Sequence, residues 1–402
     1  MQDPENTSAP APGAPAEGLT GPRRLTIVFT GSGSEYFRIW LVNTLLTLVT
    51  LTLYAPFAKV RRLRWQYANT LVDGQPLAFH AEPGKMLRGH VLLLIFSGLY
   101  LGAGQVSALA GAVSGALFVA LWPALWHASL RFRLANSSWR GLRFAFTGSV
   151  AQAYAALAPG MVASALMLGL LAWAGLADGA EGSEPAADSA WHDSLLVLGM
   201  LASLLMLPWW SWRARHYQHS HYQWGGQTTT FDARLGSCYG LALRAGAVAL
   251  LPIVVVGVVS AVALGALGLS QGGWPSSPGM LGLLMLLMGL GYVGVMLLGR
   301  AFLMSRQQNL VWNHTHSPAL RFHSQLALAR VWPRLAKNLV FTALTLGLYW
   351  PFGWVRLLAL RLESVQIDAQ EDPARWVNTL ALSAGSATGE AAGDLLDVDL
   401  GL

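Results

Sequence analysis

Long runs of apolar residues, separated by short polar segments, dominate the middle of the chain. A helix needs about 20 apolar residues to cross a hydrocarbon core of about 30 Å, and six segments reach this length. They are residues 87–107, 111–130, 151–176, 194–212, 239–266 and 280–304. Short connections near 108–110, 177–193 and 267–279 join them two by two. The pattern therefore predicts three pairs of transmembrane helices.

Two further apolar segments, residues 36–54 and 332–349, lie near the ends of the chain. Each continues through a proline, Pro56 or Pro351, into a basic stretch of helical character. Their length allows either full spans or short helical hairpins that re-enter from one side. If these units resemble the others, each hairpin returns to the side from which it started. We favour the re-entrant hairpin.

A recurring spacing indicates internal repeats, which are sought before other features. Three prolines are each followed at one fixed spacing by Asn or His and at a second, longer spacing by Phe: Pro56, Asn69 and Phe79; Pro123, Asn136 and Phe146; Pro208, His221 and Phe231. A fourth copy has Gly299 and Phe322 at the proline and phenylalanine positions. The residues from Asn43 to Phe57 also align without a gap on those from Asn338 to Phe352.

The repeats predict five tandem units, each with a short strand and a helix pair. Their boundaries are about 25–78, 79–145, 146–230, 231–321 and 322–382. Asp73-Gly74 and Gly225-Gly226 are typical hairpin turns. We therefore expect an all-α polytopic membrane protein with small β-hairpins between the helix pairs. The flanking residues 1–24 and 383–402 are expected to be disordered tails.

The distribution of charge predicts the orientation in the membrane. All 26 Lys and Arg residues fall outside the three connections within pairs, and the connection 177–193 is acidic. Basic residues instead follow the second helix of each pair. Because cytoplasmic segments carry the excess of Lys and Arg, we expect the hairpins on the cytoplasmic side.

Composition excludes several classes of protein. The chain is 54% hydrophobic and 11% charged, whereas soluble domains have about 25% charged residues. The net charge of +6 does not indicate a nucleic-acid partner, because the cations lie beside the apolar runs. Cys238 is the single cysteine, so the chain forms no internal disulfide.

The terminal motifs carry a family resemblance. Three segments resemble the YjgN family of bacterial inner-membrane proteins. They are the run from Phe29-Thr30-Gly31 through Trp40, Asn43 and Pro56 to Arg61, the block Trp139–Phe144 and the end Trp350-Pro351-Phe352. The resemblance covers about residues 25 to 380. It implies a multi-pass protein of the bacterial inner membrane with a domain of unknown function, and it supplies no catalytic residues.

Two polar stripes are candidates for a transport path. Asn43, Thr47 and Thr50 fall on one helix face, and Asn338, Thr342 and Thr345 repeat this spacing. Such stripes can form a substrate or ion site in transporters built from related halves. Alternatively, they form interhelical hydrogen bonds worth about 1 kcal/mol or less each.

Arg244 lies inside an apolar run. An ionisable residue in a span is a candidate functional residue, but an arginine near a helix end can also extend its side chain to the interface. Two interpretations of Arg244 therefore stay open: it borders a transport path, or its side chain only extends to the membrane surface.

A basic and aromatic face is the candidate for contacts with anionic lipids. Its members are Lys59, Arg61, Arg62, Arg64, Arg131, Arg133, Arg213 and Arg215. Each basic residue near a charged leaflet contributes about 1 kcal/mol of attraction. The alternative is that these residues act only as topology signals.

No catalytic constellation appears in the sequence. The histidines at 216–221 and 314–323 match no closed zinc motif, so we expect no metal, no cofactor and no enzyme. Two hypotheses stay open: a transporter or pore for a small solute, and a non-catalytic membrane scaffold or lipid-binding factor. Protein partners and oligomeric state are unknown.

Overall fold

The computed structural model describes residues 23–178, 188–266, 278–370, 373 and 377. The strands are β1 (Arg23–Phe29), β2 (Thr70–Val72), β3 (Gln75–Phe79), β4 (Ser137–Trp139), β5 (Leu142–Phe146), β6 (Tyr222–Trp224), β7 (Gln227–Thr228), β8 (Thr230–Phe231), β9 (Thr315–His316), β10 (Leu320–Ser324) and β11 (Val365–Ala369). The helices are α1 (Gly33–Val49), α2 (Ala55–Ala68), α3 (Pro83–Val106), α4 (Ala108–Ala135), α5 (Val150–Asp178), α6 (Asp188–His219), α7 (Leu235–Ala266), α8 (Pro278–Asn313), α9 (Leu328–Leu344) and α10 (Trp350–Glu363).

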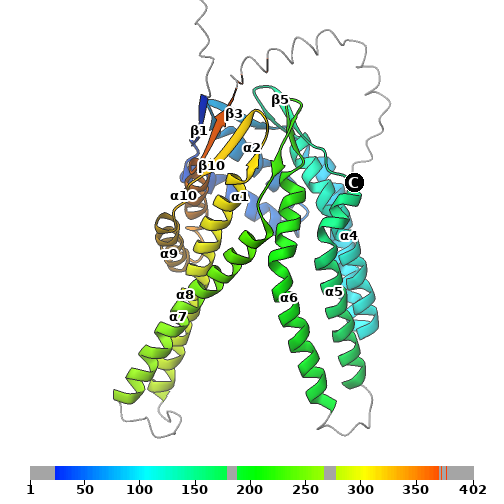
Figure 1. The fold of residues 1–402 in the computed structure, drawn as a ribbon, viewed down its shortest axis with the longest axis vertical. Coiled ribbons are helices and arrows are strands. Elements are labelled where there is room, and N and C mark those ends of the chain that lie inside the picture. Colours follow the sequence, from blue (N-terminus) through cyan, green and yellow to red (C-terminus); the bar gives the residue numbers. More distant parts are fainter. Residues whose placement is uncertain (1–22, 179–187, 267–277, 371–372, 374–376, 378–402) are drawn as a thin grey trace, which may run out of the picture.

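The strands form one antiparallel sheet in the order β7-β6-β5-β4-β3-β2-β1-β11-β10-β9-β8. Only Thr229 separates β7 from β8, although these strands stand at opposite ends of that order. The sheet therefore curls round on itself like a barrel, with the helix pairs projecting from one side (Figure 1).

This sheet corrects the predicted all-α class. The expected small hairpins exist, but they do not stand alone. An isolated two-stranded hairpin is marginally stable in water, and its edges expose unpaired backbone groups. Each hairpin therefore pairs with the next one, as β3 does with β4 and β5 with β6, and β1 pairs with β11 to join the two ends of the chain.

The six predicted spans are confirmed as helices α3 to α8, each long and apolar enough to cross a membrane. At the sheet end, five of them run at least four residues beyond the apolar segments. Helices α3 and α7 begin at Pro83 and Leu235, and helices α4, α6 and α8 end at Ala135, His219 and Asn313. The α5–α6 pair and the α7–α8 pair spread apart from each other as they extend away from the sheet (Figure 1). Most of their apolar surface is exposed, as expected of surface that faces lipid rather than protein.

The two terminal segments are helical hairpins, α1–α2 and α9–α10. The strands before and after each hairpin lie in the same sheet, so both hairpins return to their starting side. Helix α1 has 17 residues, or about 25 Å of length, which is less than a hydrocarbon core of about 30 Å. Residues with positive φ make both tips: Leu51 and Thr52 in one, Leu346 and Gly347 in the other.

Equivalent backbone hydrogen bonds join the end of each helix pair to the end of the strand that precedes the pair. The residue after a strand donates its N–H to the carbonyl at the end of a second helix: Thr30 to Asn69, His80 to Asn136, Thr147 to His221, Asp232 to His314 and Gln325 to Ser364, at 2.8–3.1 Å. Each helix pair therefore meets the sheet in the same way.

The pairing in the sheet differs from the spacing predicted for the fourth copy. Ser324 faces Val365 across the sheet, as Phe29 faces Thr70 and Phe79 faces Ser137. The equivalent of the phenylalanine is therefore Ser324 and not Phe322. Counted back from His314 at the spacing of the other copies, the equivalent of the proline is Ala301 and not Gly299.

An apolar cluster fills the inside of the curled sheet. Its buried members are Leu25, Val72, Trp139, Trp224, Ile367 and Ala369. The ring centroids of Trp139 and Trp224 are 4.8 Å apart. Because these residues come from strands all round the sheet, they block its centre with side chains.

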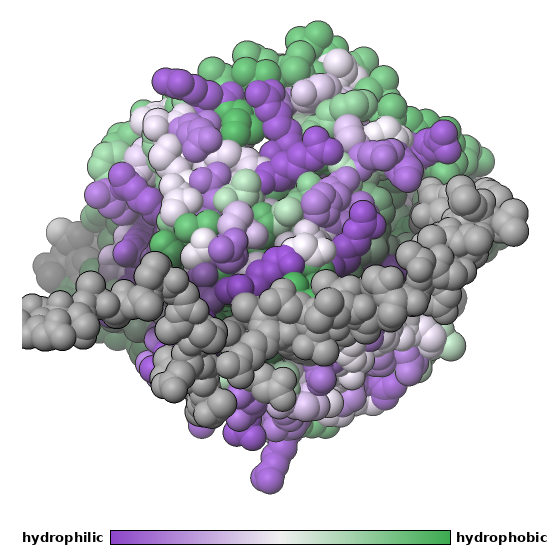
Figure 2. Space-filling view, turned by 90° about the horizontal axis from the view of Figure 1, so that it is seen from above, coloured by the Kyte–Doolittle hydropathy of each residue, from purple (hydrophilic) through white to green (hydrophobic). Residues whose placement is uncertain are grey.

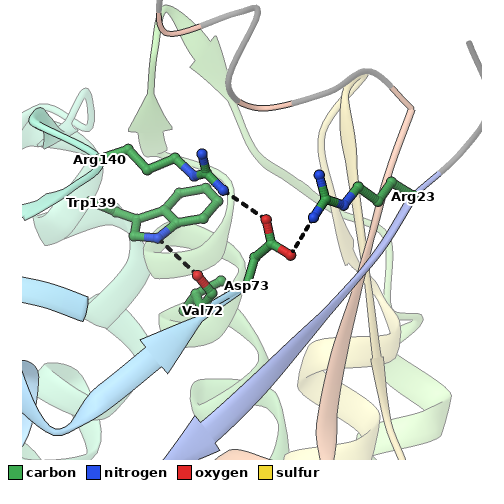
Figure 3. A network of polar contacts seen from close by, with 5 residues as sticks. All are labelled: Arg23, Val72, Asp73, Trp139 and Arg140. Carbon is green, nitrogen blue, oxygen red and sulfur yellow. Dashed lines mark hydrogen bonds and ion pairs between the residues drawn. The ribbon is translucent and has the colours of Figure 1, made fainter. Parts of the chain in front are cut away.

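A polar network beside this cluster ties three neighbouring parts of the sheet together (Figure 3). The Asp73 carboxylate accepts from Arg140 at 2.7 Å and from Arg23 at 2.9 Å. The Trp139 indole N–H donates to the Val72 carbonyl at 3.3 Å. Asp73 and Arg140 each have positive φ and precede a glycine with positive φ, as two-residue hairpin turns require.

The predicted boundary of the first tail needs correction, because β1 begins at Arg23 and includes Arg24. The rest of that tail and residues 383–402 lie outside the described residues, as do 179–187 and 267–277 in the predicted connections. The first connection is shorter than predicted, since Ser107 alone separates α3 from α4.

Candidate functional site

The two polar stripes face the partner helices of their own hairpins. Asn43 is 7% exposed, and its amide donates to the Ala58 carbonyl of α2 at 3.4 Å. Asn338 makes the same contact with the Gly353 carbonyl of α10 at 3.0 Å. The Asn43 side-chain oxygen is buried without a hydrogen-bond partner.

The threonines of the stripes bond to the backbone of their own helices. Thr47 donates to the Asn43 carbonyl at 2.6 Å. Thr50 donates to Leu46 and caps the Tyr54 N–H, and Thr345 does the same with Phe341 and Tyr349. Thr342 contributes its carbonyl, which accepts from the Gly347 N–H at 2.7 Å. Within the described residues, no hydrogen bond joins one stripe to the other.

Arg244 does not extend either stripe. It lies on α7, in a different helix pair from both hairpins, and its side chain is exposed. The structure therefore does not gather the residues of the predicted path into one place.

Three of the predicted lipid contacts form a group beneath the sheet, which we call the cationic cluster: Lys59 and Arg62 of α2 and Arg133 of α4. Lys59 lies within electrostatic range of both arginines. Lys59 and Arg133 are exposed and Arg62 is partly buried. In the described part of the chain, no carboxylate forms a salt bridge with any of the three. The cluster is therefore a concentration of positive charge open to an anion.

Two tyrosines lie near the arginines of the cationic cluster. Arg62 interacts with the hydroxyl of Tyr36, and Arg133 lies within electrostatic range of Tyr222. Gln218 donates to the Tyr222 hydroxyl at 2.5 Å. Desolvation by the surrounding protein raises the pKa of Tyr222, so its phenol keeps its proton as a hydrogen-bond donor.

The surroundings of Lys59 lower the pKa of its side chain. Desolvation by the surrounding protein lowers its pKa from the ordinary 10.5, and the positive charges of Arg62 and Arg133 lower it further. An anion bound beside Lys59 would act in the opposite direction, because an opposite charge favours the protonated form.

The other predicted lipid contacts have different surroundings. Arg64 donates to the Ala81 carbonyl at 2.8 Å, and Arg213 donates to the Ala155 carbonyl at 2.6 Å. Those two guanidinium groups are therefore partly engaged within the fold. Arg61 and Arg131 are exposed, and Arg215 is partly buried on α6.

The histidines bond to nearby protein groups. His221 and His314 each bond, through Nδ1, the carbonyl one helical turn earlier, Tyr217 or Leu310. His219 is 7% exposed and pairs with the Thr315 hydroxyl at 3.2 Å. Over the described ranges, no group of three or more His, Cys, Asp or Glu side chains is placed to hold a metal ion.

Sequence reasoning missed the continuation of the stripes into the membrane helices. Counted from the last residue of the preceding strand, Phe29 or Ser324, Thr47 and Thr342 hold the same position. In the units that follow Phe79 and Phe146, that position holds Ser97 of α3 and Ser164 of α5. Aligning the copies on the last residue of each strand would have found both serines.

Comparison with known proteins places the chain in a family. The model of the family described as "Bacterial protein of unknown function (DUF898)" matches residues 24–395. The chain belongs to this family. No solved structure matches it significantly.

Curated relatives carry the name "Inner membrane protein YjgN". The relative from Salmonella typhimurium is 46% identical over 70 residues, which is 17% of this chain and 18% of the relative. That from Escherichia coli K12 is 31% identical over 126 residues, which is 31% of this chain and 32% of the relative. The matches thus span less than a third of the curated relatives.

The family assignment and the apolar helices together describe a multi-pass membrane protein of unknown function. The resemblance to YjgN proteins seen in the terminal motifs is confirmed. Neither the family nor its named members supply an activity, so a function has to be argued from the geometry.

Proposed function

We propose that this protein is a non-catalytic lipid-binding factor of the bacterial inner membrane that holds phosphate-bearing anionic lipid headgroups at the cationic cluster. The observation that carries the proposal is the grouping of Lys59, Arg62 and Arg133 without a carboxylate partner among the described residues. Lipid phosphates are the anions that a membrane offers at the level of its headgroups.

The surroundings of the cluster support a headgroup as the ligand. Phosphate oxygens accept hydrogen bonds, and guanidinium groups and phenols donate them. Arg62 and Arg133 supply such donors near the ammonium of Lys59, and the Tyr222 hydroxyl lies near Arg133. The acidic side chains of the sheet lie elsewhere: Asp73 and Asp368 are engaged with other cations.

The transporter hypothesis stays a prediction, and two features favour lipid binding over it. Each polar stripe packs inside its own hairpin. In addition, the apolar cluster around Trp139 and Trp224 fills the centre of the sheet, where an axial path for a polar solute would run.

We also infer that the sheet faces the cytoplasm and that the five units are internal repeats. The basic residues at the sheet ends of the helices support the orientation. In a view onto the sheet, hydrophilic residues are spread over the visible face, and apolar ones lie along its upper edge and sides (Figure 2). The equivalent backbone bonds from Thr30, His80, Thr147, Asp232 and Gln325 support the repeats.

In this orientation the two terminal hairpins dip into the cytoplasmic leaflet. Their tips expose Leu51 to 83% and Leu346 to 95%. Leucines this exposed at a turn are stable when lipid, rather than water, surrounds them. The hairpins would then hold the cationic cluster at headgroup level beside the long helix pairs.

A lipid-selection experiment tests the proposal. The full chain is reconstituted in nanodiscs of phosphatidylethanolamine with a small fraction of phosphatidylglycerol, and retained lipid is quantified after exchange into pure phosphatidylethanolamine discs. We expect retained phosphatidylglycerol in wild type and its loss in a variant with Lys59, Arg62 and Arg133 all changed to Gln. At about 1 kcal/mol per basic residue, the affinity falls roughly 100-fold. Equal retention by both proteins would contradict the proposal.

A further inference from the structure

A cavity of about 690 Å³ lies among four of the membrane helices, α3 to α6. Its walls include Tyr100, Phe118, Met167, Met206 and Trp210. Volumes of about 300–1,000 Å³ are typical of sites for small organic ligands. Since the helices that line it are apolar enough to span a membrane, a ligand reaches this cavity from the hydrocarbon phase.

Glycines help to shape the cavity. Gly160 of α5 leaves room for the Trp210 ring, whose nearest atom lies 2.7 Å from where a Cβ would stand. A Cβ at Gly115 of α4 would approach Leu168 at 3.3 Å and Tyr100 at 3.5 Å. A larger side chain at Gly115 would therefore enter the cavity.

Three hydroxyl groups on the cavity wall have no hydrogen-bond partner in the described structure: Ser97, Tyr100 and Ser164. Ser203 lines the same cavity but donates to the Gly199 carbonyl of its own helix at 2.8 Å. In hydrocarbon, where water is absent, unmatched donors are costly, so several of them on one wall indicate a ligand with acceptor atoms.

The depth of these donors narrows the ligand class. From Pro83, where α3 begins, Ser97 lies about 21 Å along the helix axis. Ser164 lies about as far along α5 from Val150, where that helix begins. Both are therefore far below the headgroups of the sheet-side leaflet in a core of about 30 Å. A charged group is costly at that depth, whereas an uncharged carbonyl oxygen is a suitable acceptor.

We propose that this cavity binds an uncharged, hydrophobic carbonyl compound that dissolves in the bilayer core, of the chemical class of isoprenoid quinones. The flat ring lies against Tyr100, Phe118 and Trp210, because aromatic faces pack well on one another. Its carbonyl oxygens accept from Ser97 and Ser164. The site is separate from the cationic cluster and does not depend on the function proposed above.

Decylubiquinone is the probe for a direct test. It is titrated into nanodiscs that hold the full chain, and saturable quenching of tryptophan fluorescence is measured. We expect saturable binding in wild type. Loss of two hydrogen bonds in the Ser97→Ala, Ser164→Ala double variant should weaken it about 10-fold or more.

Two further variants complete the test. Ser203→Ala is the matched control, because its hydroxyl is already used within α6, and it should bind like wild type. Gly115→Leu should abolish saturable binding by filling the cavity. The proposal is overturned if the double variant binds as tightly as wild type. It is also overturned if wild type shows no saturable quenching.

Discussion

Replacing Asp73 with Asn tests how the polar network holds the sheet closed. Asp73 has φ +52° at its turn, a conformation that Asn adopts as readily as Asp. The substitution therefore keeps the turn and removes the charge that faces Arg140 and Arg23. Any loss of stability then comes from the ion pairs and not from the backbone.

The two pairs contribute unequally. The side chains of Arg140 and Asp73 are 18% and 13% exposed, so the bond at 2.7 Å is shielded and worth about 1.5–3 kcal/mol, as for other bonds to charged groups. Arg23 is 52% exposed, so screening limits its pair to less than about 1 kcal/mol. We expect the substitution to lower the free energy of local opening by about 2–3 kcal/mol.

Hydrogen exchange in nanodiscs measures this opening. A loss of about 2–3 kcal/mol corresponds to roughly 30- to 150-fold faster exchange, and we expect it in peptides that cover β2, β3 and β4. Asp368→Asn is the matched control, because its partners Arg24 and His323 are 64% and 52% exposed, so its loss should change exchange little. Unchanged exchange in Asp73→Asn would refute the idea that this network stabilises the closed sheet.

The contacts support three more predictions. Tyr154→Phe removes the bond to the Ala120 carbonyl that joins α5 to α4, so thermal unfolding should show a loss of about 0.5–1.5 kcal/mol; an unchanged transition would contradict this. The affinity for phosphatidylglycerol should fall as pH rises through the lowered pKa of Lys59, below 10.5, because only the protonated amine attracts the headgroup. If the affinity of the Lys59→Arg variant falls over the same pH range, a group other than Lys59 causes the fall. Cysteines placed at Leu51 or Leu346 in a Cys238→Ser background should resist a membrane-impermeant maleimide in sealed vesicles, and rapid labelling would place the tips in water.

The elements with a strong pattern could be predicted from the sequence. The long apolar runs identified the six spans, and paired turn residues such as Asp73-Gly74 identified the hairpins. The union of the hairpins into one sheet could not be predicted, because strands as short as Thr70–Val72 carry no pairing information of their own. Their partners are set by the helix pairs that bring them together.

The candidate site was predictable only in part. The cations of α2 and α4 stood out as a basic face, but their grouping depends on Arg133 approaching Lys59 from a different helix pair. The spacing of the polar residues revealed both stripes. It could not show whether the two stripes line one path or pack within two separate hairpins. Gly299 and Phe322 were aligned with the proline and phenylalanine of the other copies because the residues at those positions, Ala301 and Ser324, are of different types.

Native mass spectrometry of lipids bound to the purified protein tests directly whether the cationic cluster holds anionic lipid. Wild type is compared with the Lys59, Arg62 and Arg133 triple Gln variant, and with a control that loses the same charge on the sheet at Arg24, Arg143 and Arg321. We expect bound anionic phospholipid in wild type and control and its loss in the cluster variant. The same anionic lipid in all three proteins, or none in wild type, would contradict it.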